Sequence, residues 1–500
     1  MDLCLLLEMV TSGYGPRRAL TVARDDASFD GLAAMAGVAG AWFTDRQARA
    51  VIHIGTNGLV YPACLFGAAL AGVPLIPLNY RLGTDQLDAL IRANPGAVVV
   101  HHGERPLSAD PDLSIATETF LAHIAMAPSP GPDLERLGAG GDPDRPALCL
   151  YTSGTTAAPK AVVLRHRHLM AYILGTVEFG SAGEDQAALV AVPPYHIAGV
   201  ANLLSNLYAG RRIIYLSQFD PQVWLDVVRT ERVTQAMVVP TMLAQVIGAL
   251  GDAREAGTPS LRALSYGGAR MPIPVIKRAL ELFPDTGFVN SYGLTETSST
   301  IALLGPEDHR LALESSERAV RERLSSVGRL LDGMEMQVRD EGGQALPVGQ
   351  VGMVFLRGDQ IADECDGASL LDAEGWFCSG DRGRVDDAGY VYIEGRADDT
   401  IIRGGENIAP AEIEDVLLSH PEVLDAVVIG VADHEWGQRL VAVVVRSPHA
   451  SVGEIELQDL CRKRLRSSKT PSAVEFRDEL PRTATGKILR REVLEQVTIS

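Results

Sequence analysis

Between about residues 50 and 300, short apolar runs alternate with segments of helical periodicity, and this alternation constrains the fold more than any other feature of the sequence. Such alternation is typical of α/β domains with mostly parallel sheets, because parallel strands need helical crossovers between them. We therefore predict an α/β fold. The strand-like runs are GAVVVHH, ALCLY, AALVAVP, RRIIYL, QAMVVP, LRALSYGG and TGFVNSYG.

The sequence pattern changes twice after this region. Between about 325 and 395, short strands and Gly/Asp turns predict a small β-region. After GRADDTIIRGGENI the order becomes helix, strand, strand, helix, which predicts a compact α+β module. A chain of 500 residues is long for a single core. We expect a large N-terminal domain of stacked α/β subdomains plus the β-region over 1–396, and a small α+β domain over 397–500.

Charge and cysteine usage narrow the class of protein. The chain has 45 basic and 64 acidic residues, a net charge of −19, which disfavours nucleic acid and anionic membranes as partners. The six cysteines are scattered, with no CxxC pair and no zinc-ligand spacing. Reduced thiols in a cytoplasmic protein are the simplest interpretation.

One uncharged segment, 51–80, is long enough to cross a bilayer. However, Pro62, Pro74, Pro77 and several glycines interrupt it. A buried strand–helix–strand unit fits this pattern better than a membrane span. The N-terminal MDLCLLLEMV lacks the basic start and the cleavage site of a signal peptide. We expect no integral membrane association.

The stretch YTSGTTAAPKAVVL, at 151–164, combines small hydroxyl residues, a glycine and a lysine between two apolar runs. Polyphosphates are held by such hydroxyls, by backbone N–H groups and by a cation. The stretch is not a Walker A loop, because Pro159 precedes Lys160 and a strand-like AVVL follows. Taken alone, it is either a strand–loop–strand phosphate loop or a flexible polar loop.

Six further motifs follow this stretch along the chain. Together with it they resemble the motifs of the adenylate-forming superfamily, which comprises acyl- and aryl-CoA synthetases, amino-acid adenylation domains and firefly luciferase. The resemblance covers nearly the whole chain from about residue 50. It implies a C-terminal domain that is mobile. The further motifs, in the family's order, are SYGGA (265–269), NSYGLTE (290–296), SVGRLLDG (326–333), WFCSGDRG (376–383), GRADDTIIRGGENI (395–408) and PRTATGK (481–487).

The resemblance implies a reaction in two halves that uses ATP, Mg²⁺ and CoA. A carboxylate attacks the α-phosphorus of ATP to give an acyl-adenylate and pyrophosphate, and a thiol then displaces AMP. The carboxylate is already ionised at pH 7, so the protein must neutralise phosphate charge and align the reactants. A kinase-type enzyme would instead release ADP.

Residues that match the family's motifs are expected to take the family's roles. Lys487 bridges the carboxylate and the α-phosphate, Glu296 binds Mg²⁺, and Thr155 completes the catalytic set. Asp381 accepts the ribose hydroxyls, Tyr292 lies against adenine, and the other members contact phosphates, ribose or the adenylate. The full ATP and AMP set is Thr152, Ser153, Gly154, Thr155, Thr156, Lys160, Gly267, Gly268, Ala269, Ser291, Tyr292, Gly293, Thr295, Asp381, Arg396 and Lys487.

The same resemblance assigns the second half-reaction. Asp398 matches a hinge about which the small domain rotates, so that Gly404 and Gly405 replace the lysine and admit a pantetheine arm. Trp436 matches an aromatic residue that stacks on CoA in some relatives. The phosphate loop departs from the family pattern at Ala157 and Ala161, where relatives usually have glycine.

Four positions are expected to contact the acyl group: His196, Val239, Gly267 and Ile301. The stretch YHIAGVAN carries no acid to pair with an amine, which disfavours an α-amino acid substrate. The surrounding positions are small or apolar and favour a fatty, aryl or bulky alicyclic acid. Two alternatives remain: an acyl-AMP ligase that loads a carrier protein, and a binding protein that retains the adenylate pocket without turnover.

Overall fold

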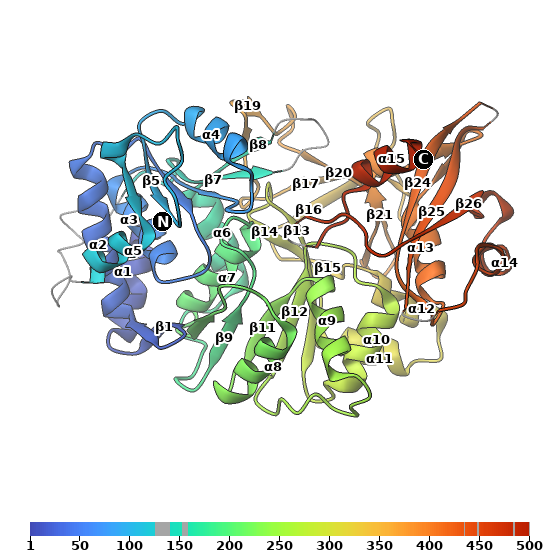
Figure 1. The fold of residues 1–500 in the computed structure, drawn as a ribbon, viewed down its shortest axis with the longest axis horizontal. Coiled ribbons are helices and arrows are strands. Elements are labelled where there is room, and N and C mark those ends of the chain that lie inside the picture. The colour runs from blue at the N-terminus through green and yellow to red at the C-terminus, as the bar shows by residue number, and fades with distance from the viewer. Residues whose placement is uncertain (126–140, 153–158, 435, 448–449, 484–485, 500) are drawn as a thin grey trace.

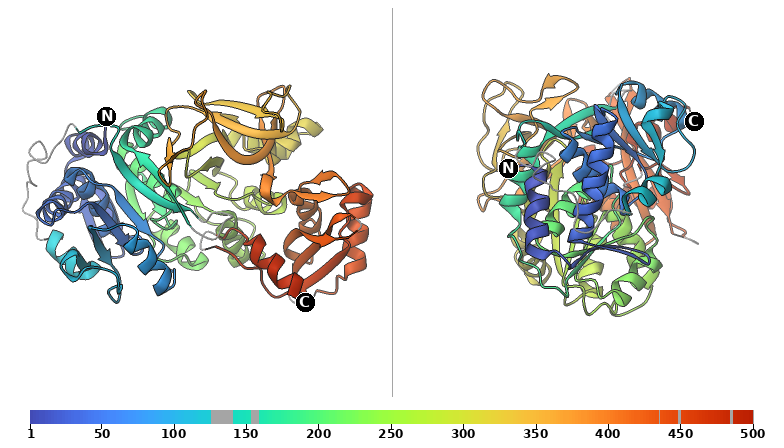
Figure 2. Two further views of the ribbon diagram at one scale, coloured as in Figure 1. Left: turned by 90° about the horizontal axis from the view of Figure 1, so that it is seen from above. Right: turned by 90° about the vertical axis from the view of Figure 1, so that its left-hand side faces the viewer.

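The computed structural model describes residues 1–125, 141–152, 159–434, 436–447, 450–483 and 486–499. The chain folds as a mixed α/β protein, as the sequence predicts (Figure 1). Three sheets fill the part before residue 400, and a smaller α+β unit follows at the opposite end from the N-terminus (Figure 1). Figure 2 shows the same arrangement from two further sides, with the C-terminal unit packed beside the N-terminal sheets.

The first sheet has nine strands and a parallel centre. Its order is β15-β14-β13-β12-β11-β9-β10-β1-β2, with antiparallel pairs at both edges. Helices cover the strands of this sheet (Figure 1). This burial explains why the parallel strands appear in the sequence as continuous apolar runs. The strands are β1 Arg18–Val22, β2 Asp25–Ser28, β9 Ala187–Val190, β10 Arg212–Tyr215, β11 Gln235–Val238, β12 Ala263–Gly267, β13 Gly287–Leu294, β14 Ser299–Leu304 and β15 Arg329–Leu330.

The second sheet has eight strands in the order β19-β18-β8-β7-β4-β3-β5-β6. The uncharged segment 51–80 forms its parallel core as strand, helix and strand, which confirms the buried unit expected from the sequence. Within the stretch 151–164, β7 and β8 pair antiparallel on either side of residues 153–158, which lie outside the described residues. The strands are β3 Ala50–Ile54, β4 Leu75–Leu78, β5 Ala97–His101, β6 Ser114–Ala116, β7 Pro146–Thr152, β8 Lys160–Arg165, β18 Glu364–Cys365 and β19 Ala368–Ser369.

The β-region expected after residue 325 forms a four-stranded antiparallel sheet in the order β16-β17-β20-β21. The C-terminal unit contains a two-stranded ribbon and the three-stranded sheet β24-β25-β26. The strands are β16 Glu335–Arg339, β17 Gly352–Arg357, β20 Phe377–Val385, β21 Val391–Arg396, β22 Ile401–Arg403, β23 Glu406–Ile408, β24 Val423–Asp433, β25 Gly437–Arg446 and β26 Ala473–Arg477.

Small residues allow the helices α2 and α3 to pack closely in the N-terminal part. Gly67 of α3 faces Ala39 of α2 so closely that a Cβ added to Gly67 would lie 2.7 Å from the Ala39 Cβ. The helices are α1 Leu3–Tyr14, α2 Phe29–Asp45, α3 Val60–Ala71, α4 Thr84–Arg92, α5 Thr117–Ala125, α6 His166–Thr176, α7 Ile197–Tyr208, α8 Pro221–Thr230, α9 Pro240–Leu250, α10 Ile273–Leu282, α11 Pro306–Glu314, α12 Arg318–Glu322, α13 Pro410–Leu418, α14 Glu454–Arg464 and α15 Arg490–Ile499.

Two observations complete the fold. The first fifty residues contribute α1, α2 and the edge strands β1 and β2, so the N-terminus finishes a sheet whose other strands come from 187–330. Within the described residues, none of the helices combines the length and the apolar character needed to cross a membrane.

Candidate active site

Three residues predicted to contact AMP meet where β13 faces the sheet β16-β17-β20-β21. The Tyr292 hydroxyl donates to Asp381 Oδ2 at 2.5 Å, and Arg396 Nη1 donates to Asp381 Oδ1 at 3.2 Å. Arg396 also donates to the Ser379 carbonyl at 2.8 Å. The register of β20 with β21 sets this contact, because Asp381 lies directly opposite Arg396.

Asp381 is a buried carboxylate with two contending influences on its charge. Burial raises its pKa above the usual range, while the Tyr292 hydrogen bond and the positive charges of Arg396 and Lys487 lower it. Both oxygens retain lone pairs beyond those used by Tyr292 and Arg396, so the carboxylate can accept further hydrogen bonds from a diol. This is the arrangement that a ribose contact requires.

The SYGGA and NSYG motifs lie side by side because β12 and β13 pair in parallel, with Gly267 opposite Ser291. A Cβ added to Gly267 would lie 2.3 Å from the Ser291 carbonyl oxygen, so only glycine fits there. The next residues, Gly268 and Ala269, are exposed, and Gly268 has φ +80°. Their backbone is therefore open to a ligand.

Glu296 stands in the turn between β13 and β14, beside Thr295. Its carboxylate makes no hydrogen bond or ion pair to another residue in the part of the chain that the structure describes. Burial raises the pKa of the Cys365 thiol; the charge of Glu296 adds to this rise and that of Lys160 opposes it, so both side chains lie within electrostatic reach of Cys365. A carboxylate without a protein partner among the described residues fits Mg²⁺, which takes few protein ligands and completes its shell with phosphate oxygens and water.

The phosphate loop itself is only partly within the described residues. Thr152 ends β7 and Lys160 begins β8, directly opposite each other. Ser153, Gly154, Thr155 and Thr156 lie outside the described residues, as does Ala157.

A segment that the sequence analysis missed holds this region together. We call residues 360–366 the strap. The Gln360 amide donates to the carbonyls of Thr297 and Thr300, both at 2.8 Å, and the Ala362 N–H donates to the Glu296 carbonyl at 2.7 Å. At its other end Asp366 exchanges two hydrogen bonds with the backbone of Ala161.

Lys487 lies within electrostatic reach of Asp381, since its charge lowers the pKa of that carboxyl group. The turn that carries it packs against the first turn of α9: a Cβ added to Gly486 would lie 2.1 Å from Thr241 Oγ1. Gly486 has φ +78°, a conformation that favours glycine. The turn that carries Lys487 is thus in contact with the N-terminal part of the molecule, within electrostatic reach of Asp381.

The four predicted acyl contacts come from β12, which ends at Gly267, from β14, and from the starts of α7 and α9. Val239 precedes α9, and its side chain lies 3.7 Å from a Cβ added to Gly268, while Ile301 of β14 is fully buried. His196 begins α7, and burial lowers its pKa to about 4, so the ring is neutral at pH 7. Its Nε2 and the hydroxyl of neighbouring Tyr195 are buried and have no hydrogen-bond partner among the described residues.

The predicted CoA contacts cluster on the C-terminal unit. The Gly404 N–H donates to the Trp436 carbonyl at 2.8 Å, and Gly404 and Gly405 both have positive φ. The Trp436 side chain remains half exposed. The expected hinge residue, Asp398, lies in the short turn Ala397–Asp399 between β21 and β22.

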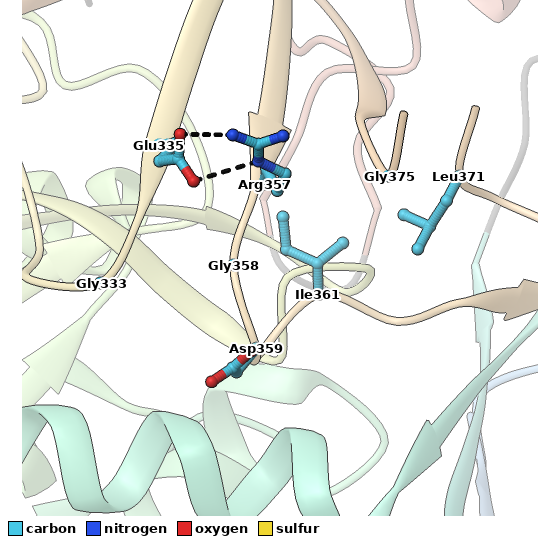
Figure 3. Close-up of a pocket in the computed structure, with 8 residues that line it drawn as sticks. All are labelled: Gly333, Glu335, Arg357, Gly358, Asp359, Ile361, Leu371 and Gly375. Carbon is cyan, nitrogen blue, oxygen red and sulfur yellow. Dashed lines mark hydrogen bonds and ion pairs between the residues drawn. The ribbon is translucent and has the colours of Figure 1, made fainter. Parts of the chain in front are cut away.

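A surface cavity of about 400 Å³ lies elsewhere, on the small β-region. Figure 3 shows Glu335 and Arg357 joined by two hydrogen bonds at its side. None of the site residues predicted from the sequence lines this cavity, and its one arginine is already paired. We therefore assign no part of the adenylate site to this cavity.

Known proteins resemble this chain over most of its length. The family model "AMP-binding enzyme" matches residues 7–364, and "AMP-binding enzyme C-terminal domain" matches 412–487. A feruloyl-CoA synthase of an Amycolatopsis species is 35% identical over 90% of this chain and 89% of its own length. The fatty acid–[acyl-carrier-protein] ligase ScoC of Streptomyces coeruleorubidus is 33% identical over 89% and 86%.

Solved structures of known proteins share the fold of this chain. The crystal structure of ATP-bound MatB from Rhodopseudomonas palustris superimposes with a TM-score of 0.86 at 25% identity and covers 99% of each chain. The family model covers well over half of the sequence, and the fold matches an ATP-bound relative along its whole length. The chain therefore belongs to the family of AMP-binding enzymes.

Proposed function

We propose that this protein is an ATP-dependent carboxylic acid:CoA ligase that works through an acyl-adenylate. The observation that carries the proposal is the meeting of Tyr292, Asp381 and Arg396 with the charge of Lys487. These groups come from two parts of the chain, and together they supply a diol acceptor and a cation. The family and the feruloyl-CoA synthase relative support the same reaction.

In the first half-reaction a carboxylate oxygen of the acid bonds to the α-phosphorus of ATP, and the bond to pyrophosphate breaks. Lys487 neutralises the charge shared by the carboxylate and the α-phosphate, and Asp381 fixes the ribose. In the second, the sulfur of CoA bonds to the acyl carbon and AMP leaves, while the thiol proton passes to solvent.

The remaining site residues would bind the substrates and Mg²⁺ and orient them. Thr152, Ser153, Gly154, Thr155, Thr156 and Lys160 would hold the β- and γ-phosphates, and the Thr295 hydroxyl would also contact phosphate. Glu296 would hold Mg²⁺, which neutralises phosphate charge when bound. Tyr292 would lie against adenine beside the backbone of 267–269. Gly404, Gly405 and Trp436 would receive CoA after rotation about Asp398 between domains 1–396 and 397–500.

The acid is hydrophobic in this proposal. The positions expected to contact the acid, Val239, Ile301 and Gly267, carry no polar side chain, and the buried neutral His196 adds no charge to stabilise a second carboxylate. The feruloyl-CoA synthase relative makes aryl acids the first class to test. We also propose that the reaction takes place in the cytoplasm, where the scattered cysteines would stay reduced.

A second candidate differs in the acceptor. The ScoC relative transfers its acyl group to an acyl-carrier protein, so the thiol could belong to a carrier protein instead of CoA. Pyrophosphate release from ATP and Mg²⁺ across aryl, alicyclic and fatty acids, with and without CoA, distinguishes the two. Multiple turnovers that need CoA, with AMP as product, support the ligase; a single burst that CoA leaves unchanged points to a carrier protein.

One variant tests the lysine directly. Lys487→Ala is expected to slow adenylate formation at least a hundredfold while leaving thioester formation from supplied acyl-adenylate nearly intact. Equal loss of both steps would contradict the assigned role. Absence of pyrophosphate release with every acid would favour the binding-protein alternative.

A further inference from the structure

We infer that Arg270 and Asp415 form a latch that positions Lys487 for adenylate formation. The two residues form an ion pair between the N-terminal sheets and α13 of the C-terminal unit. Ion pairs between other described residues stay within one of these two parts. This inference rests on the proposed function, since it assigns the pair to one of the two half-reactions.

Arg270 directly follows the SYGGA motif, whose last residues, Gly268 and Ala269, are exposed. Its side chain is 39% exposed and that of Asp415 is 29% exposed, and each is covered partly by the other part of the molecule. Burial raises the pKa of Asp415 to about 6; Arg270 acts against this rise, and the neighbouring Glu414 and Glu412 add to it. Arg270 is therefore the counter-charge that keeps Asp415 ionised in this arrangement.

The acids of α13 have separate tasks. Glu412 pairs with Lys469, and Glu414 pairs with Arg490 at 2.7 Å; both contacts stay inside the C-terminal unit. Arg490 also reaches Asp399, next to the expected hinge residue, at 3.5 Å. Asp415 alone among them bonds outward. One helix thus connects the hinge turn with the contact to Arg270.

The latch and the lysine turn act on the same interface. Gly486 packs on Thr241, and the charge of Lys487 reaches Asp381, only while the C-terminal unit holds this orientation. Rotation about the hinge would separate Arg270 from Asp415 together with these contacts. The pair therefore favours the adenylate-forming orientation and must break before thioester formation.

Removing one partner of a partly buried pair costs most when it leaves a buried charge uncompensated. Arg270→Gln leaves the Asp415 carboxylate without its counter-charge, whereas Asp415→Asn leaves a guanidinium that can reach water. We expect adenylate formation, measured in a single turnover with ATP and the best acid of the panel, to slow about tenfold in Arg270→Gln and about threefold in Asp415→Asn.

Thioester formation from supplied acyl-adenylate and CoA is expected to be unchanged or faster in both variants. The charge swap Arg270→Asp with Asp415→Arg is expected to return adenylate formation to within about threefold of wild type. The matched control is Arg357→Gln, which breaks the exposed pair with Glu335 inside the small β-region and leaves both steps unchanged.

A second measurement does not depend on activity. Amide hydrogen exchange in α9, where Thr241 meets Gly486, is expected to be faster in Arg270→Gln, normal in the swap and normal in Arg357→Gln. Equal slowing of both half-reactions, or exchange in α9 that Arg270→Gln leaves unchanged, would overturn the latch. A wild-type protein that forms no adenylate would refute the proposed function, and the exchange comparison would still decide on the latch.

Discussion

The Tyr292 hydroxyl donates the hydrogen bond that does most to keep the buried Asp381 carboxylate ionised. Tyr292→Phe removes that bond, so the pKa of Asp381 should rise further. Since the ribose hydroxyls need an ionised acceptor, activity is lost as the pH falls through this pKa. We expect the acid limb of the kcat/KM profile for ATP to move upward by about one pH unit.

The measurement is kcat/KM for ATP between pH 5 and 9. Tyr390→Phe is the matched control, because its hydroxyl also donates to a carboxylate, that of Asp308 at 2.6 Å, away from the site. An acid limb that does not move in Tyr292→Phe, or that moves equally in Tyr390→Phe, would show that this bond does not set the charge of Asp381.

Gly486 governs the approach of the lysine turn at the scale of a single Cβ. Gly486→Ala meets Thr241 and places alanine at φ +78°, which costs about 1–2 kcal/mol for the backbone alone. Adenylate formation should fall about tenfold or more, with the melting temperature little changed. Adding Thr241→Ala should recover part of the rate, because it removes the Oγ1 and Cγ2 atoms that lie nearest to the new Cβ. Gly248→Ala, in α9 with open space around it, is the control.

At the scale of elements, the strap connects the Glu296 turn with β8. Gln360→Leu removes both amide hydrogen bonds and leaves the Thr297 and Thr300 carbonyls unpaired, at a cost of about 1–3 kcal/mol. A looser Glu296 turn should raise the Mg²⁺ concentration needed for half-maximal adenylate formation several-fold.

A control must show that a loss of stability does not by itself raise the Mg²⁺ requirement. Thr286→Val removes another buried hydrogen bond, from Thr286 Oγ1 to the Leu261 carbonyl at 2.9 Å, far along the sequence from the strap. It should lower stability to a similar degree and leave the Mg²⁺ requirement unchanged. Equal Mg²⁺ curves for Gln360→Leu and wild type would mean that the strap does not position Glu296.

The elements that the sequence predicted are those with strong local patterns. The parallel strands from β3 to β13 and the helix in segment 51–80 lie where the apolar runs, and the Gly and Pro residues between them, predicted them. The strap was not predicted, because GDQIADECDG has no periodicity and its role depends on pairing with β8, about 200 residues earlier. The strand β1 was not predicted for the same reason: it pairs with β10, which is remote in sequence, and β2 in turn pairs with β1.

For the whole molecule, the site was predictable only through its motifs. Tyr292, Asp381 and Arg396 were named from separate matches, yet their mutual hydrogen bonds depend on the registers of two different sheets. Arg270 and Asp415 carry no motif at all, and only the packing of the C-terminal unit on the N-terminal sheets brings them together. Contacts of this kind leave no local signal in a sequence.

Buried histidines give the whole molecule a distinct acid sensitivity. Burial is the main cause that lowers the pKa to about 4 for His53, His166, His168, His196 and His309. In the unfolded chain these groups titrate near pH 6.5, so between about pH 6.5 and 4 the unfolded state binds more protons than the folded state. The free energy of unfolding should therefore fall steeply as the pH is lowered through this range.

Asp415 and Asp381 act in the opposite sense, because burial raises the pKa of each, to about 6 for Asp415, and lets the folded state bind a proton more readily than the unfolded chain; they are two groups against five. Urea unfolding at pH 7.5, 6.5, 5.5 and 5.0 measures the slope. His309→Gln, which removes one buried imidazole outside the adenylate site, should reduce that slope by about one proton and keep activity. A flat profile between pH 6.5 and 5.0 would mean that these histidines are protonated in the folded protein, and therefore that their surroundings admit water.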